Sequence, residues 1–165
     1  MAGSGSFEEF YTGAVGRLLG QLFPVTGDLH EAEEVVQEAF TRAAARWSRL
    51  RDYDVPEAWV RRVAMNLAAD RARTLRRQAK AMGKLHPPPE VLGASVEALA
   101  LAEALRTLPI RQRQVLVLHY LVDLPVDQVA HTLGMPEGTV KSLLSRGRQL
   151  LASKLGEAEE VLDPQ

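Results

Sequence analysis

VDQVAHTLGMPEGTVKSLLSR, residues 126–146, has the residue spacing of a helix-turn-helix. Ala130 is small where the two helices would cross, and Gly134 suits a turn that requires a positive φ. Val140, six residues after Gly134, would face back into the junction. A second helix of this kind enters the major groove of DNA, with flanking cations on phosphates. The alternative interpretation is a helical hairpin whose arginines only face solvent.

Helical periodicity extends outward from this stretch over most of the chain. Ala, Leu, Arg and Glu dominate, and these residues favour helices. Pro24 and Gly27 are expected to end the first helix, which Ser6 is expected to cap, and residues 48–56 are expected to form a loop. We therefore predict an all-α fold with helices at 7–22, 29–47, 56–80, 96–108, 110–122, 126–133 and 137–155.

Three consecutive prolines, Pro87 to Pro89, divide the helical pattern in two, because such a run favours an extended linker. We predict two small helical domains joined by a flexible linker: residues 1–80, a linker at 81–95, residues 96–156, and an acidic tail at 157–165. A linker this short would also allow the two domains to pack against each other.

The composition excludes several classes of protein. The chain has no cysteine, so disulfides, thiolate zinc sites and cysteine nucleophiles are absent. The first ten residues lack the pattern of a signal peptide, and no apolar run approaches the ~20 residues that span a bilayer. The four histidines are scattered, so no metal or other cofactor is expected. We expect a cytoplasmic protein without membrane insertion.

Charge is distributed unevenly, although the net charge is only −1. Residues 61–84 contain eight basic side chains and one acid, Asp70, and residues 139–156 contain basic side chains and no acid. Acids gather at 28–38 and 157–163. Two basic patches and one acidic face indicate DNA on one side and a protein on the other.

Three blocks together resemble the extracytoplasmic-function (group four) sigma factors of the sigma-70 family. Residues 108–151 look like region four of that family, AEEVVQEAFTRAAARW (32–47) resembles region 2.2, and EAWVRRVAMNLAADRARTLRR (57–77) resembles region 2.4. The likeness covers nearly the whole chain in the family's order. It implies an RNA polymerase sigma factor, which binds the core enzyme and directs promoter-specific initiation.

The resemblance implies a role for each block. The acidic helix would contact core RNA polymerase through Glu34, Gln37 and Glu38, and the partners in that enzyme would be its beta and beta-prime subunits. The next helix would bind the minus-ten element, with a flipped base held by Trp59, Val63 and Asn66. Arginines would bind the phosphates around the melted strand, and the candidates are Arg61, Arg62, Arg71, Arg73, Arg76 and Arg77. Not all six can face DNA, because Arg61 and Arg71 lie on different faces of the helix from some of the others. The minus-ten site is therefore expected to include Arg62, Arg73, Arg76 and Arg77.

The second helix of the helix-turn-helix would read the minus-thirty-five element. Lys141, Ser142, Ser145 and Arg146 match the base-facing positions of the family, and Thr139 and Arg148 suit phosphates. Leu143 stands where relatives commonly have arginine. It is expected either to be buried or to contact a thymine methyl group.

The resemblance also implies promoter DNA and an anti-sigma factor as partners, and no catalytic residues, so we do not expect an enzyme. Two other functions remain open from the residues. One is a stand-alone helix-turn-helix transcription regulator, which would bind DNA without polymerase and usually at palindromic sites. The other is a helical adaptor or inhibitor that binds polymerase without DNA.

Overall fold

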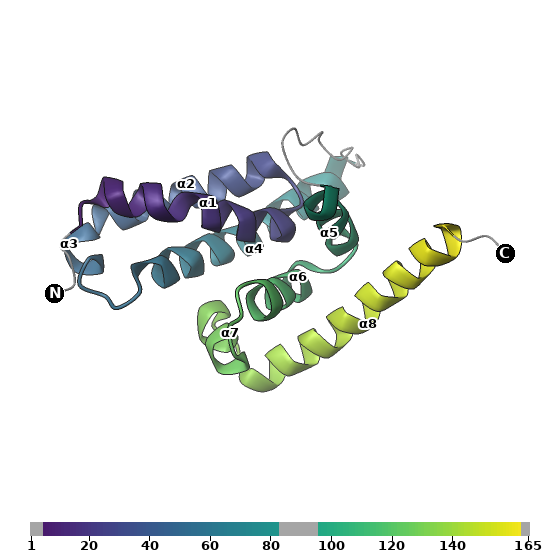
Figure 1. Ribbon diagram of the computed structural model, residues 1–165. Helices are drawn as coiled ribbons and strands as arrows, with labels where there is room; N and C mark the ends of the chain where they lie inside the picture. The colour runs from purple at the N-terminus through teal and green to yellow at the C-terminus, as the bar shows by residue number, and fades with distance from the viewer. Residues whose placement is uncertain (1–4, 83–95, 163–165) are drawn as a thin grey trace.

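The computed structural model describes residues 5–82 and 96–162, and this part of the chain is made of helices and their connections (Figure 1). The all-α prediction is confirmed. The elements are α1 (Phe7–Thr26), α2 (Leu29–Ala45), α3 (Trp47–Leu50), α4 (Pro56–Met82), α5 (Val96–Arg106), α6 (Ile110–Leu116), the π-helical segment η1 (Val117–Leu121), α7 (Val126–Leu133) and α8 (Glu137–Leu162). No described helix is long and apolar enough to cross a bilayer.

The first helix begins as predicted and ends later. The Ser6 hydroxyl accepts a hydrogen bond from the Glu9 N–H at 3.2 Å. Pro24 does not end the helix, so that prediction is wrong, and α1 continues to Gly27 at φ 72°. One proline removes a single N–H donor, and burial of Phe23, Pro24 and Val25 in the last turn offsets that loss.

An aromatic cluster fixes the turn that follows α2. The Trp47 ring stacks on Phe10 with centroids 4.9 Å apart, and it meets Phe7 edge-on at 5.8 Å. Residues 47–50 therefore form the short helix α3, where a loop beginning at Ser48 was expected. Helices α1, α2 and α4 pack on one another and bury side chains such as Leu18, Val36, Phe40 and Ala64.

The C-terminal half differs from the prediction mainly in its helix ends. Residues 117–121 have π-helical geometry, and Asp123 takes a φ of 61° in the turn before α7. Helix α8 continues to Leu162, so it includes most of the residues predicted as an acidic tail. Helix α4 includes Ala81 and Met82, the first residues of the predicted linker, and the remainder of that linker lies outside the described residues.

The two halves pack against each other. Helix α1 contacts α5, α6 and η1, and α4 contacts α6 and α7 (Figure 1). A single cluster of buried side chains extends through both halves, from Leu18 and Val60 to Leu118 and Val129. The polar faces of α2, α4 and α8 are presented on the outside of this shared core.

Candidate nucleic-acid and protein interfaces

Helices α7 and α8 form the predicted helix-turn-helix. Gly134 has a φ of 64°, and its N–H donates to the Ala130 carbonyl. Ala130 is 7 % exposed at the crossing, and Val140 is fully buried. The predicted roles of these three residues in the turn and its core are confirmed.

The opposite face of α8 is polar and solvent-exposed. Thr139, Lys141, Ser142, Ser145 and Arg146 are all exposed within the first three turns of the helix. Leu143 lies between them, is half-buried and packs against the core, so burial accounts for a leucine at this position. The face thus combines two cations and three hydroxyls, which can donate to phosphates or base edges.

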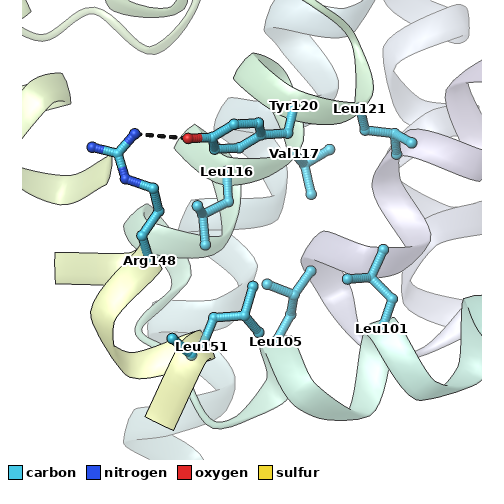
Figure 2. A pocket seen from close by; sticks show the side chains of 9 residues that line it. Leu101, Leu105, Leu116, Val117, Tyr120, Leu121, Arg148 and Leu151 are labelled. Carbon is cyan, nitrogen blue, oxygen red and sulfur yellow. Dashed lines mark hydrogen bonds between the residues drawn. The ribbon is translucent and has the colours of Figure 1, made fainter. Parts of the chain in front are cut away.

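Arg148 lies further along α8 and is exposed as well. Its Nη1 donates to the Tyr120 hydroxyl at 2.7 Å, which ties the end of η1 to α8 (Figure 2). Of the six residues that the sequence grouped on this helix, Arg148 thus has a guanidinium engaged by Tyr120.

Arg148 borders an apolar groove of about 480 Å³ between α5, η1 and α8 (Figure 2). Sequence analysis did not predict this groove. Leu121 is 48 % exposed and Tyr120 is 53 % exposed. The groove is lined by Leu101, Leu105, Leu116, Val117, Tyr120, Leu121, Arg148, Leu151 and Ala152.

The three candidate polymerase-binding residues share the exposed face of α2. Glu34, Gln37 and Glu38 border a shallow depression whose walls also include His30, Glu33 and Thr41. The Gln37 amide donates to the Tyr11 hydroxyl at 2.6 Å, and Glu38 pairs with Arg42 at 3.1 Å. These contacts orient the side chains and leave carboxylate oxygens facing solvent.

Arg71 holds the start of α2 to α4. Its Nε donates to Glu31 at 2.7 Å, and its Nη2 lies 3.1 Å from a Glu34 oxygen. The hydrogen bond from Arg71 is the main cause that lowers the pKa of the Glu31 carboxyl, against the opposing effect of burial. Arg71 therefore has a structural role, in line with the expectation that it lies on a different face of α4 from some of the other arginines.

Trp59, Val63 and Asn66 lie at i, i+4 and i+7 on α4 and are each half-buried. The Arg46 guanidinium sits 5.8 Å from the centroid of the Trp59 ring. Both apolar members pack against the core and still expose part of their surface. The face therefore offers an apolar wall together with one amide.

The arginines of α4 separate into two sets. Arg62, Arg76 and Arg77 are exposed, and Arg73 is exposed and pairs with Asp70 at 2.9 Å. Arg61, by contrast, is 8 % exposed, because its Nε donates to Gln21 at 2.9 Å and its Nη2 to Glu57 at 3.2 Å. The burial of Arg61 agrees with the expectation that the six arginines do not all face DNA.

The described side chains include no group of three or more His, Asp or Glu residues that could hold a metal ion. The chemistry that these faces offer is binding: hydroxyl and guanidinium donors on α8 and α4, and carboxylate acceptors on α2.

Comparison with known families matches both halves of the chain. Residues 10–78 match the family described as Sigma-70 region 2, and residues 98–151 match Sigma-70, region 4. The extracytoplasmic-function RNA polymerase sigma factor SigW of Bacillus subtilis is 31 % identical over 155 residues, covering 81 % of this chain and 80 % of SigW.

Solved structures show the same arrangement of helices. RpoE of Bartonella quintana, in complex with the anti-sigma factor NepR, aligns with a TM-score of 0.71 over 91 % of this chain and 96 % of that chain, at 20 % identity. CnrH, in complex with the cytosolic domain of CnrY, aligns with a TM-score of 0.62 over 94 % of this chain and 93 % of that one, at 26 % identity.

Proposed function

Since the chain belongs to the extracytoplasmic-function sigma factors of the sigma-70 family, we propose that its two halves divide the recognition of a promoter between them. The protein binds core RNA polymerase and directs promoter-specific initiation. In this proposal residues 1–80 bind the polymerase and the minus-ten element, and residues 96–156 bind the minus-thirty-five element. This proposal rests mainly on one observation. Helix α2 has an acidic face, and helices α4 and α8 have separate basic faces.

Core polymerase is assigned to the face of α2 that carries Glu34, Gln37 and Glu38. Carboxylates there suit a partner surface lined with arginines or lysines. Complementary charge speeds the association of two proteins and favours one alignment of their surfaces. The half-exposed Glu34 is already held by Arg71, so its carboxylate is partly ordered before the partner arrives.

The minus-ten element is assigned to α4. Trp59 and Val63 supply apolar surface on which an extruded base can pack, and the Asn66 amide can read the edge of that base. Arg62, Arg73, Arg76 and Arg77 would bind phosphates along the same helix. Each phosphate contact in single-stranded DNA steepens the log–log salt dependence by about 0.7.

The minus-thirty-five element is assigned to α8. Lys141, Ser142, Ser145 and Arg146 would face the bases, with Thr139 on a phosphate. Arg148 is assigned to a phosphate as well, and it must then leave the Tyr120 hydroxyl that it now contacts. Each good bidentate contact between a side chain and a base is worth about 1–3 kcal/mol of discrimination.

The family consists of transcription initiation factors, and we propose that this chain has no catalytic activity of its own and works in the cytoplasm. We also propose an anti-sigma factor as a partner, supported by the likeness to CnrH, which was solved with the cytosolic domain of CnrY. Purification of the tagged chain from its native host should recover polymerase together with one dedicated inhibitor. Recovery of polymerase alone, under every growth condition tried, would count against the inhibitor.

The proposed function is tested by transcription in vitro from fragmented host DNA, with core polymerase and with or without this chain. Discrete new start sites should appear, and Glu34→Arg should abolish them because it reverses charge on the polymerase face. Glu103→Arg, an exposed carboxylate on α5, is the matched control and should leave them unchanged. No new starts, with tight sequence-specific binding by the free chain, would instead support a stand-alone regulator.

A further inference from the structure

The Gln37 side chain on α2 is held by a residue of the neighbouring helix α1. Its Nε2 donates to the Tyr11 hydroxyl at 2.6 Å, and α1 packs beside α2. The Oε1 atom of Gln37 has no hydrogen-bond partner among the described residues, so it is left to accept one from another molecule. Gln37 is exposed on the face that carries the carboxylates of Glu34 and Glu38. The held amide therefore adds a further acceptor to an acidic face, which suits a cationic partner surface.

Aromatic contacts fix the position of the Tyr11 hydroxyl. The Tyr11 ring meets the Phe40 ring edge-on with centroids 4.9 Å apart, and it lies 6.3 Å from the Phe7 ring. Phe40 is only 2 % exposed and belongs to the core. A tyrosine side chain has two torsions, so contacts on its ring also determine where its hydroxyl lies. Gln37 is thus bound to a group that is itself immobile.

The two carboxylates of the same face have more mobile partners. Glu38 pairs with Arg42, whose side chain is 51 % exposed. Glu34 pairs with Arg71, whose side chain is 40 % exposed. Ion pairs between exposed side chains are weak, because water competes for the charges and two long side chains must lose their freedom. Tyr11 is therefore the partner that orders its target most firmly.

We propose that Tyr11 is a positioning residue for core polymerase, which acts by holding the Gln37 amide in the orientation that the polymerase binds. Immobilising a glutamine side chain during association lowers the affinity by about two- to tenfold. In this chain the hydrogen bond to Tyr11 orders the side chain before the polymerase arrives. The proposal rests on the assignment of polymerase to α2. It adds a residue of α1 that acts through Gln37 and need not touch the polymerase.

The first test measures the affinity for core polymerase by fluorescence anisotropy. The chain has no cysteine, so one dye can be attached at Ser153→Cys, an exposed position on α8. Tyr11→Phe removes the hydroxyl, keeps the ring and should lower the affinity about two- to tenfold. Tyr53→Phe is the matched control and should leave the affinity unchanged. Tyr53 is exposed, and its hydroxyl has no hydrogen-bond partner among the described residues.

A double-mutant cycle separates positioning from a general effect on the protein. In the Gln37→Ala background the amide is absent, so Tyr11→Phe should have no further effect on the affinity. An equal loss of affinity in both backgrounds, or no loss in the native background, would overturn the positioning role.

The variant Glu34→Arg tests the assignment of polymerase to α2 by itself, because it reverses a charge on the same face. If Glu34→Arg abolishes binding and Gln37→Ala leaves the affinity unchanged, only the positioning role is overturned. If neither substitution changes the affinity, the assignment on which the proposal rests is overturned as well.

Nuclear magnetic resonance relaxation gives a readout that a merely structural role of Tyr11 would not move. In the unsubstituted protein, the order parameter of the Gln37 side-chain amide should exceed that of Gln128, an exposed glutamine on α7. Tyr11→Phe should lower the Gln37 value and leave the Gln128 value unchanged, while circular dichroism shows the same helix content. Equal order parameters for the two amides in the unsubstituted protein would overturn the proposal without any variant.

Discussion

At the scale of single residues, the arginines show how geometry divides a uniform sequence pattern. Residues 61–77 read as one basic run, and the structure assigns its members to different tasks. Arg61 holds α4 to α1 through Gln21, and Arg71 holds α4 to α2 through Glu31. Arg62, Arg76 and Arg77 remain exposed. Sequence spacing predicts which helix carries a charge. It does not predict a carboxylate forty residues away that neutralises that charge.

The pair formed by Glu31 and Arg71 makes stability depend on pH. The folded-state pKa of Glu31 is lowered from its ordinary value of 4.5, so the stabilisation is fully present above that value and is lost as the pH falls through the folded pKa. Glu31→Gln should cost about 1 kcal/mol in the free energy of unfolding at pH 7, a moderate value because Arg71 is partly exposed.

This dependence is measured by urea denaturation between pH 7 and pH 3. The curves of the Glu31→Gln variant and the unsubstituted protein should converge as the pH falls below 4.5. Glu33→Gln, an exposed neighbour on α2, should follow the unsubstituted protein throughout. A difference at pH 7 that persists unchanged at pH 3 would show that loss of the ionised pair is not the cause.

At the scale of elements, the sequence predicted which helices exist better than where they end. The helix-turn-helix was predictable in detail because a small residue, a glycine and a buried valine must stand at fixed spacing. Pro24 was misleading, since the packing that keeps α1 helical through Val25 comes partly from residues distant in sequence. The π-helical turn at 117–121 has no local signal, and neither does the groove beside it.

Gly27 illustrates a helix end that local chemistry does determine. Its φ of 72° is disfavoured for residues with a side chain, and a Cβ atom there would stand 3.1 Å from Arg106 Nε. Gly27→Ala should therefore destabilise the protein by about 1–2 kcal/mol.

The matched substitution is Gly16→Ala in the middle of the same helix. Gly16 has a negative φ in α1, and a Cβ atom at this position would meet no other atom within 4 Å. The greater helix propensity of alanine should stabilise the protein by about 0.5–1 kcal/mol. Urea denaturation of the two variants measures these opposite changes as a difference between their midpoints. Equal midpoints for Gly27→Ala and Gly16→Ala would refute the argument from backbone conformation.

At the scale of the whole molecule, the prediction of two domains needs refinement. The linker prolines predicted two small domains that could pack against each other, and the buried side chains form one cluster through both halves. Units of 60 to 80 residues bury limited apolar surface when alone, so each gains from the other. Periodicity along a sequence shows which faces are apolar. It does not show whether such a face turns toward its own half or toward the other.

The shared core predicts cooperative unfolding. Calorimetry of the free chain should give a single transition whose calorimetric and van't Hoff enthalpies agree. The double variant Arg106→Ala, Gln114→Met should broaden this transition or divide it in two, because it weakens the contact between the halves. Two separate transitions in the unsubstituted protein would mean that the halves fold independently.

The hydrogen bonds that Arg106, Arg113 and Gln114 donate across the two halves have a genetic consequence, because their acceptors are main-chain carbonyls of α1, its C-cap Gly27 and α4. Every residue has a carbonyl, so a point mutation in α1 or α4 rarely deletes an acceptor, whereas a single codon change in α5 or α6 removes a donor. Mutations that weaken the contact between the halves should therefore be concentrated in the C-terminal half. The strength of this contact can evolve there while the residues assigned to the minus-ten element stay constant.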